Sequence, residues 1–234
     1  MSLIFLPRVV SDGLIFSADA ANHKSYPGSG TTWYDLTQNN YNATLINSPT
    51  FTSENSGGFG FDGTDDYVEL GQVPTTVLSS FTWQFIFKPI SFTNGVRLIT
   101  TRGDNGKGFW LNITNTKIAQ VTIGTVLGGD YDFTESINYL NINNIYFLTF
   151  VIDNTTAQLY INGILIQTPQ TISSTRTQSL TNSWVNGVFL EPNGTLRPAT
   201  YANQTLYSLS YYNRALSSNE VLQNYNALKP RFGL

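Results

Sequence analysis

The end of the chain constrains the fold more than any other stretch, because it predicts a strand, a turn, a helix cap and a helix in that order. Residues 206–212 are rich in aromatic and aliphatic side chains, which is typical of a buried or half-buried strand. Ser217 and Glu220 then form a capping box, in which the hydroxyl can accept from a first-turn N–H and the carboxylate from the cap N–H. The helix predicted over residues 217–228 has one apolar face, formed by Val221, Leu222, Tyr225 and Leu228.

The rest of the chain predicts short strands separated by turns. Residues 81–87 place aromatic side chains at the odd positions, so these side chains share one face of a strand. Asn162 and Gly163 predict a type I′ hairpin, because both residue types accept positive φ angles. Further strands are predicted at residues 14–19, 96–101, 109–113, 117–123, 146–152, 157–161 and 185–190. Roughly twelve to fourteen short strands predict an all-β fold, a two-sheet antiparallel jelly-roll sandwich with one short C-terminal helix.

No linker or change of composition divides the sandwich, so we expect one domain over residues 14–234 after an N-terminal arm over residues 1–13. The two sheets should enclose Phe81, Trp83, Phe85, Phe87, Phe150 and Tyr160 or their strand neighbours. The arm is apolar, and it either packs on its own domain or attaches to a neighbouring subunit. We expect the second, because soluble monomers limit exposed apolar patches. The assembly residues would be Leu3, Ile4, Phe5, Leu6, Val9 and Val10.

Composition excludes several function classes. Charged residues make up only 12% of the chain, and the net charge of −3 provides no basic surface for nucleic acid. The chain has no cysteine and a single histidine, His23, which excludes disulfides and argues against a zinc site or a Ser-His-Asp triad. No apolar run is long enough for membrane insertion, and residues 1–7 lack the features of a signal peptide. We therefore expect synthesis in the cytoplasm.

Two sets of sequence pieces resemble a known family. Residues 212–217 (Tyr-Asn-Arg-Ala-Leu-Ser), the pair Glu-Val at 220–221 and residues 224–228 (Asn-Tyr-Asn-Ala-Leu) resemble the C-terminal signature of laminin G-like domains in the concanavalin A-like lectin/glucanase group. Residues 19–22, 25–30, 33–36 and 61–68 are similar to laminin G-like modules of bacteriophage structural proteins. The two sets bracket nearly the whole chain, whereas the middle matches only in its pattern.

The resemblance implies a non-enzymatic structural protein of a phage virion, made in the host cytoplasm. It would be a capsid decoration, fibre or tail component that displays the sandwich and assembles with copies of itself or with capsid proteins. Glycan binding for adhesion is the family activity that it implies, and no cofactor is required. The alternative from another class is a soluble carbohydrate-binding module or a degenerate glycoside hydrolase.

Sugar binding needs exposed aromatic rings for stacking and polar groups for the hydroxyls. In the long loop over residues 20–41 the candidates are Tyr26, Trp33 and Tyr34, although burial as loop anchors is the alternative for these rings. Elsewhere the candidates are Arg102, Trp110, Arg197 and Tyr201.

Two acidic segments are candidates for other chemistry. Asp130, Asp132 and Glu135 have the spacing of the glucanase Glu-x-Asp-x-x-Glu motif, but the first position is Asp, whose shorter side chain would withdraw the nucleophile. We expect a solvated or calcium-binding acidic turn there and no catalytic residues. Asp62, Asp65 and Asp66 surround a glycine turn, where their oxygens either bind calcium or cap the turn itself.

Overall fold

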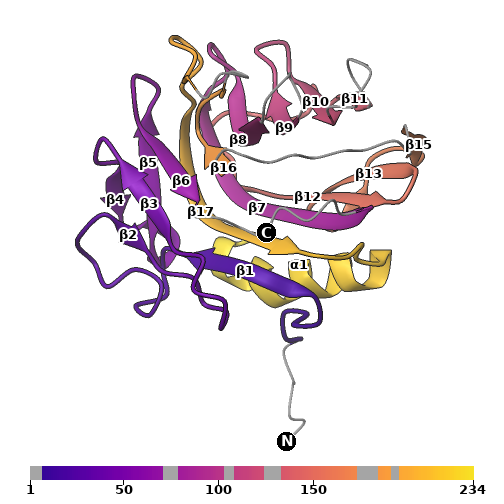
Figure 1. Cartoon of the computed structure of the whole chain (residues 1–234), viewed down its shortest axis with the longest axis horizontal. Helices are drawn as coiled ribbons and strands as arrows, with labels where there is room; N and C mark the ends of the chain where they lie inside the picture. Colours follow the sequence, from indigo (N-terminus) through magenta and orange to yellow (C-terminus); the bar gives the residue numbers. More distant parts are fainter. Residues whose placement is uncertain (1–6, 71–78, 103–107, 124–132, 173–183, 191–194) are drawn as a thin grey trace, which may run out of the picture.

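Two antiparallel sheets are stacked face to face in the computed structural model of the protein, and one helix lies on the outer face of one sheet (Figure 1). The structure describes residues 7–70, 79–102, 108–123, 133–172, 184–190 and 195–234. All of the described strand pairs are antiparallel. The predicted all-β sandwich with a C-terminal helix is confirmed.

The nine-stranded sheet carries the helix. Its strands run in the order β14 (Ile164–Leu165), β13 (Thr156–Ile161), β12 (Tyr146–Asp153), β7 (Ser80–Ser91), β17 (Asn203–Tyr212), β5 (Gly58–Asp62) and β4 (Thr50–Thr52). Strand β1 (Leu14–Asp19) also pairs with β17, and β15 (Gln170–Thr171) pairs with β13. A short 3₁₀ helix, η1 (Glu54–Ser56), links β4 and β5.

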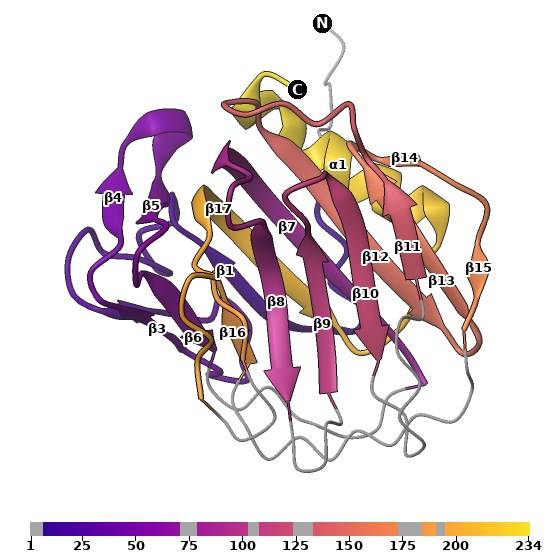
Figure 2. The same ribbon diagram turned by 90° about the horizontal axis from the view of Figure 1, so that it is seen from above.

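The eight-stranded sheet forms the opposite layer, which faces the viewer in Figure 2. Its order is β11 (Phe133–Ser136), β10 (Ile118–Ile123), β9 (Gly108–Ile113), β8 (Val96–Arg102), β16 (Trp184–Asn186), β6 (Tyr67–Leu70), β3 (Ala43–Ile46) and β2 (Thr32–Trp33). The strand predicted at residues 185–190 is wrong in length. It ends at Asn186 because Gly187 takes a left-handed φ of 100° and turns the chain over the outer face of this sheet.

The core between the sheets is aromatic. The odd-numbered rings of β7 point inward as predicted, and Trp83 stacks on Tyr211 with ring centroids 4.4 Å apart. Phe150 also lies in this core. Tyr160 does not, because it points to the outer face of its sheet, where its hydroxyl bonds to Ser218; its strand neighbours Leu159 and Ile161 are the inward residues.

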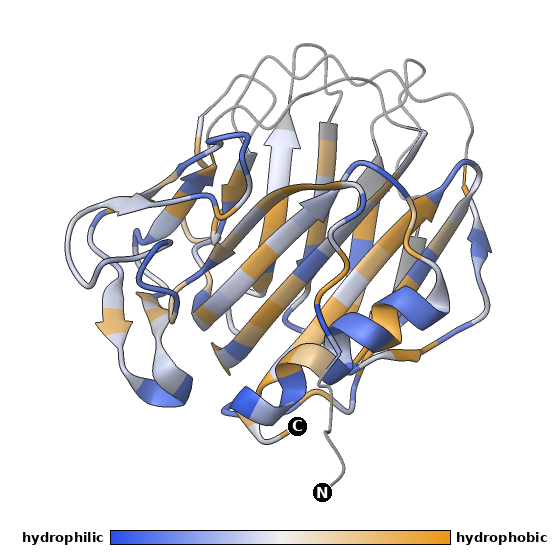
Figure 3. Ribbon diagram, turned by 90° about the horizontal axis from the view of Figure 1, so that it is seen from below, coloured by the Kyte–Doolittle hydropathy of each residue, from blue (hydrophilic) through white to orange (hydrophobic). Residues whose placement is uncertain are grey.

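Helix α1 (Ser218–Phe232) begins at the predicted capping box. The N–H of Glu220 donates to Oγ of Ser217, and the Glu220 carboxylate accepts from the Ser217 N–H at 2.8 Å. The helix lies across the outer face of the nine-stranded sheet (Figure 3) and runs past the predicted end at residue 228. Within the part of the chain that is described, no helix combines the length and apolar character needed to cross a membrane.

The buried stripe of this helix differs from the predicted one. Val221, Asn224 and Phe232 are its buried residues, whereas Leu222 is 43% exposed. The expectation that Leu222 faces the sandwich is therefore wrong. With about 100° between successive residues, only one of Val221 and Leu222 can face the sheet, and the spacing of Asn224 and Phe232 from Val221 selects Val221.

The hairpin at Asn162–Gly163 is confirmed. Both residues have positive φ, 52° and 77°, and the turn brings Ile164 of β14 opposite Ile161 of β13.

Candidate functional site

The outer face of the eight-stranded sheet, the layer nearest the viewer in Figure 2, carries a group of side chains that the strand register brings together. Arg97 of β8 lies opposite Asn112 of β9, and Thr100 lies opposite Trp110. Trp110 and Asn112 are two apart on β9 and share a face, away from the core into which Leu111 and Ile113 project. A register shift between Arg97 and Ile99 lets Arg97 and Thr100, three apart on β8, lie opposite these two residues on the same outer face.

A covering segment, made up of residues 187–190 and 195–202, folds back over this face. It is anchored at its start by the N–H of Gly187, which donates to the carbonyl of Arg97 at 2.8 Å, and at its end by the N–H of Ala202, which donates to the carbonyl of Gly187. Leu190 and Leu196 pair as an isolated antiparallel bridge within it. The segment thereby places Phe189 and Arg197 above the strand residues.

Four side chains, Arg97, Trp110, Phe189 and Arg197, form what we call the basic–aromatic patch. The ring of Phe189 is central: the guanidinium carbon of Arg197 lies 4.4 Å from its centroid and that of Arg97 lies 5.9 Å away. Trp110 meets the same ring edge-on with centroids 5.6 Å apart. Phe189 is buried, Trp110 is half-buried and Arg197 is exposed. The patch therefore combines a half-buried indole ring with two guanidinium groups, one exposed and one largely buried.

The electrostatics of the patch are unusual at Arg97. Burial, with a smaller contribution from the neighbouring Arg197 cation, lowers the pKa of Arg97 to about 10, so the group is still charged at neutral pH. Within the described residues it forms no ion pair, and its buried Nε has no hydrogen-bond partner. The buried hydroxyl of Thr100, on the same face, is also without a partner.

Two tyrosines border the patch. The rings of Tyr67 and Tyr201 lie 6.4 Å apart, half-buried against Val185, Val188 and Leu190. Burial is the main cause that raises the pKa of both tyrosines, so both hydroxyls are neutral donors at ordinary pH. Three of the predicted glycan candidates, Trp110, Arg197 and Tyr201, are thus on this one face. Arg102 was a further candidate, and its side chain lies outside the described residues.

The first loop behaves differently. Trp33 is fully buried and Tyr26 is 7% exposed, and both rings pack edge-on against Phe59 of β5. Trp33 and Tyr26 are therefore loop anchors, and the prediction that they offer stacking surfaces is wrong because no ring face is accessible. Tyr34, at 43% exposed, is the one candidate of this loop that a sugar could reach.

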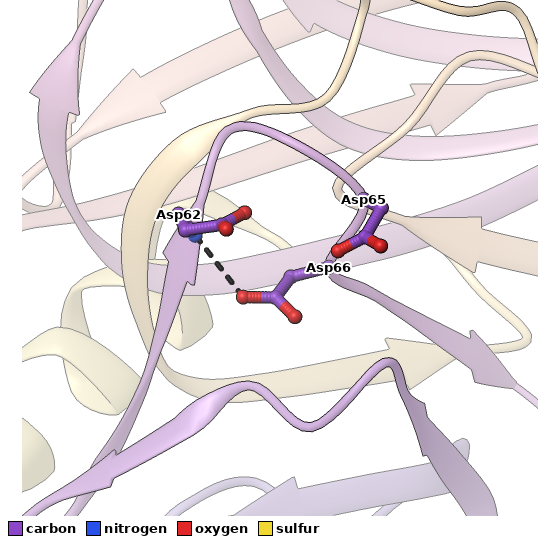
Figure 4. Close-up of side chains that lie close together, drawn as sticks. All are labelled: Asp62, Asp65 and Asp66. Carbon is purple, nitrogen blue, oxygen red and sulfur yellow. Dashed lines mark hydrogen bonds between the residues drawn. The ribbon is translucent and has the colours of Figure 1, made fainter.

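The acidic turn at Asp62, Asp65 and Asp66 brings the three carboxylates together, each with an oxygen within 4.8 Å of the others (Figure 4). Asp62 accepts from the N–H of Thr64 at 2.7 Å, and Asp66 accepts from the N–H of Asp62 at 3.1 Å. The hydrogen bond from Thr64 lowers the pKa of Asp62, while burial raises that of Asp66. These bonds are those of a self-capped Asx turn, and the oxygens are also of the kind that calcium prefers.

The second acidic segment lies at a sheet edge. Phe133–Ser136 is strand β11, the edge strand beside β10, so a strand stands where a turn was predicted. Asp130 and Asp132 lie outside the described residues. The glucanase comparison is therefore not tested by the structure.

A cavity of about 240 Å³ lies between helix α1 and the outer face of the nine-stranded sheet. Its apolar lining includes Val9, Leu14, Ile86, Phe147 and Leu228. The polar groups that reach it already have hydrogen-bond partners: Gln84 bonds to Thr149 and Asn224, and Ser208 to the carbonyl of Ala18. Ser17 bonds to Ser210, and Asp19 is paired with Arg231. It offers shape and apolar surface, with few free polar groups to orient a ligand.

The N-terminal segment enters the domain earlier than predicted. Val10 is 9% exposed and packs with Tyr212 and Val221, and Val9 lines the cavity. Residues 7–13 therefore belong to the sandwich, which corrects the boundary placed at residue 14 and the assembly role given to Val9 and Val10. The other four residues of the expected assembly element, Leu3, Ile4, Phe5 and Leu6, lie outside the described residues.

Sequence reasoning missed Arg97 and Phe189. A charged residue near the start of a strand that continues with apolar and threonine side chains is a usable signal for Arg97. No local signal marks Phe189, which was assigned to a strand, because its role depends on a segment that folds over a sheet formed more than seventy residues earlier.

Comparisons with known proteins place the chain among lectin-like sandwiches. A family model described as "Concanavalin A-like lectin/glucanases superfamily" matches residues 62–222. No curated protein matches the sequence.

Solved structures of similar fold include three binding domains of clostridial toxins. The botulinum neurotoxin serotype G binding domain has a TM-score of 0.68 and 17% identity, and covers 91% of this chain and 50% of its own. The binding domain of Paraclostridial Mosquitocidal Protein 1 has a TM-score of 0.70 and 17% identity; the match covers 92% of this chain and 52% of that structure. The botulinum neurotoxin serotype D ligand-binding domain in complex with N-acetylneuraminic acid has a TM-score of 0.70 and 16% identity; the match covers 92% of this chain and 50% of that structure. The chain thus spans about half the length of these structures, and the similarity is one of fold.

Proposed function

Because the chain belongs to the concanavalin A-like lectin/glucanase superfamily, we propose that it is a non-enzymatic glycan-binding protein and that its site is the basic–aromatic patch with Tyr67 and Tyr201. The observation that carries the proposal is the convergence of Trp110, Arg197 and Tyr201 on the outer face of the eight-stranded sheet. Half-buried aromatic rings offer apolar contact to a sugar ring, and the flanking guanidinium and phenol groups can bond to hydroxyls and carboxylates.

The similar structures support a binding role. They are described as binding domains of toxins, and one of them holds N-acetylneuraminic acid. A sandwich of this kind serves many functions, so the fold alone leaves the position of a sugar on this chain open.

We further propose that the protein is a structural component of a phage particle, as a capsid decoration, fibre or tail protein. The support is the similarity of residues 19–22, 25–30, 33–36 and 61–68 to phage laminin G-like modules, together with the run of apolar side chains at residues 3–6. This run could attach the domain to another copy of the chain or to a capsid protein by adding to a sheet edge. The glycan patch lies on the outer face of the sheet opposite helix α1, and Val10 packs beside that helix.

A glycan array of neutral, carboxylated and sulfated sugars tests the binding function. We expect the intact protein to bind a subset, Trp110→Ala to lose that binding and Tyr34→Ala to keep it. Tyr34 is the matched control because it is an exposed aromatic side chain on the first loop. Loss with Tyr34→Ala alone would move the site to that loop, and binding of no glycan by the intact protein would refute the function.

Two further measurements address the rest of the proposal. Proteomics of purified particles should find the protein as an integral component in fixed ratio to the capsid protein. Incubation with β-glucans should release no reducing ends. Release that disappears with Glu135→Gln would show a glycoside hydrolase instead.

A further inference from the structure

Arg97 differs from the other partly buried arginines of the described chain. Arg214 bonds to both oxygens of Glu220, at 3.0 and 2.6 Å, and Arg231 bonds to both oxygens of Asp19, at 2.6 and 2.7 Å. Their side chains are 28% and 18% exposed, and each has a carboxylate. Arg97 is also mostly buried, yet it faces a ring, Phe189, and a second cation, Arg197.

A buried charge without a counterion is costly, because it loses hydration that no partner replaces. The cation–π contact with Phe189 offsets only part of that loss, since such contacts contribute about 0.5–2 kcal/mol. The described carboxylates nearest in the fold do not supply the rest. Glu69 lies two strands away across Val185, and Asp65 lies beside Tyr201; neither forms an ion pair with Arg97.

We propose that Arg97 holds the anionic group, a carboxylate or a sulfate, of an acidic sugar bound at the basic–aromatic patch. This inference rests on the glycan-binding function proposed above and names its ligand class. An incoming oxyanion would accept from the Arg97 guanidinium, and Arg197 would add a second positive charge beside it. Trp110 offers its half-buried ring to the sugar carrying the anion, and the Thr100 hydroxyl lies on the same face.

The first test uses a simple anion. Inorganic sulfate is titrated into the full chain while the Nε–Hε signals of the arginines are followed by NMR. We expect the Arg97 signal to move saturably and the Arg231 signal to stay, because Arg231 is already paired. Movement of Arg97 no larger than that of exposed Arg8 would overturn the proposal.

The second test compares glycans on the array. Arg97→Gln should weaken binding of carboxylated or sulfated sugars about 10- to 100-fold, the usual loss for a charge-assisted hydrogen bond. Arg97→Lys should restore part of this binding, because lysine supplies the positive charge but not the two parallel N–H donors of a guanidinium group. Lys24→Gln, an exposed cation on the first loop, is the control and should change nothing. Carboxylated and sulfated members of the array distinguish the two anions.

The failures of the two proposals are separable. Binding of neutral sugars that Arg97→Gln leaves intact would overturn the acidic-ligand inference and keep the glycan function. Saturable sulfate binding at Arg97 with no glycan bound would refute the glycan function and with it the sugar assignment.

Thermal stability gives an independent readout. If Arg97 is kept for binding, Arg97→Gln should leave Tm unchanged or raise it, because a desolvated unpaired charge is removed. Arg231→Gln should lower Tm by leaving Asp19 without its partner. A drop in Tm for Arg97→Gln as large as that for Arg231→Gln would show that Arg97 is structural, which would overturn the proposal.

Discussion

The side-chain oxygen of Asn224 accepts a hydrogen bond from the backbone N–H of Val10 at 2.7 Å, across 214 residues of sequence. The Asn224 amide donates to Gln84 and to the hydroxyl of Tyr212, which itself donates to the carbonyl of Val10. This fully buried network joins the N-terminal segment, strands β7 and β17 and helix α1. Buried polar networks of this kind stabilise a fold only while every member is bonded.

Truncation at two points should separate assembly from folding. Deleting residues 2–6 leaves the Val10 bonds intact, so we expect an unchanged Tm and a loss of incorporation into the particle. Deleting residues 2–11 removes both Val10 bonds and leaves Asn224 unsatisfied, which should cost about 1–3 kcal/mol per buried group. Differential scanning calorimetry and light scattering measure the two effects. Normal assembly of the shorter deletion would show that residues 2–6 are not the attachment element.

Neighbouring helix positions should differ in their contribution to stability. Val221→Ala should lower the free energy of unfolding by about 2–3 kcal/mol, because the side chain is fully buried. Leu222→Ala should cost less than about 1 kcal/mol, since Leu222 is largely exposed. Ser217→Ala should cost about 0.5–2 kcal/mol through loss of the cap. Urea unfolding measures all three, and equal losses for Val221 and Leu222 would contradict the observed packing of α1.

Acid should destabilise the start of this helix. The ion pair with Arg214, with the Ser217 hydrogen bonds, lowers the pKa of Glu220 from 4.5 to about 2. A carboxyl with a lowered folded pKa contributes stability above its unfolded pKa and loses it as the pH falls toward the folded pKa. Stability should therefore decrease between about pH 5 and pH 2, and Glu220→Gln should flatten that decrease. Glu54→Gln, which removes a 61% exposed carboxylate, is the control and should keep the wild-type slope.

The acidic turn should be stable without calcium. The bonds from Thr64 and Asp62 already cap the turn, so we expect equal Tm values in millimolar calcium and in EDTA. Asp65→Asn is the informative variant, because no described hydrogen bond of the turn uses the Asp65 carboxylate. A calcium-dependent rise in Tm that Asp65→Asn abolishes would identify a calcium site instead.

The sequence by itself determined the longer strands, such as β1, β7, β12 and β17, the Asn162–Gly163 hairpin and the capping box at Ser217. Each depends on interactions between residues close along the chain: side-chain alternation, positive φ at two adjacent positions, and a hydrogen bond between residues three apart. The sandwich follows from the number and spacing of those strands. These features were predictable because no distant part of the chain is needed to form them.

Only the tertiary structure decided which side chains are accessible and which are brought together. Trp33 and Trp110 are both aromatic residues near loops, yet Trp33 is buried against Phe59 and Trp110 is half-buried on an outer face. Val10 is buried because a helix more than two hundred residues later packs over it. Arg97 and Arg197 meet at Phe189 only because residues 187–190 and 195–202 fold back across the sheet. Burial and charge proximity depend on contacts between distant segments, and local sequence patterns do not encode those contacts.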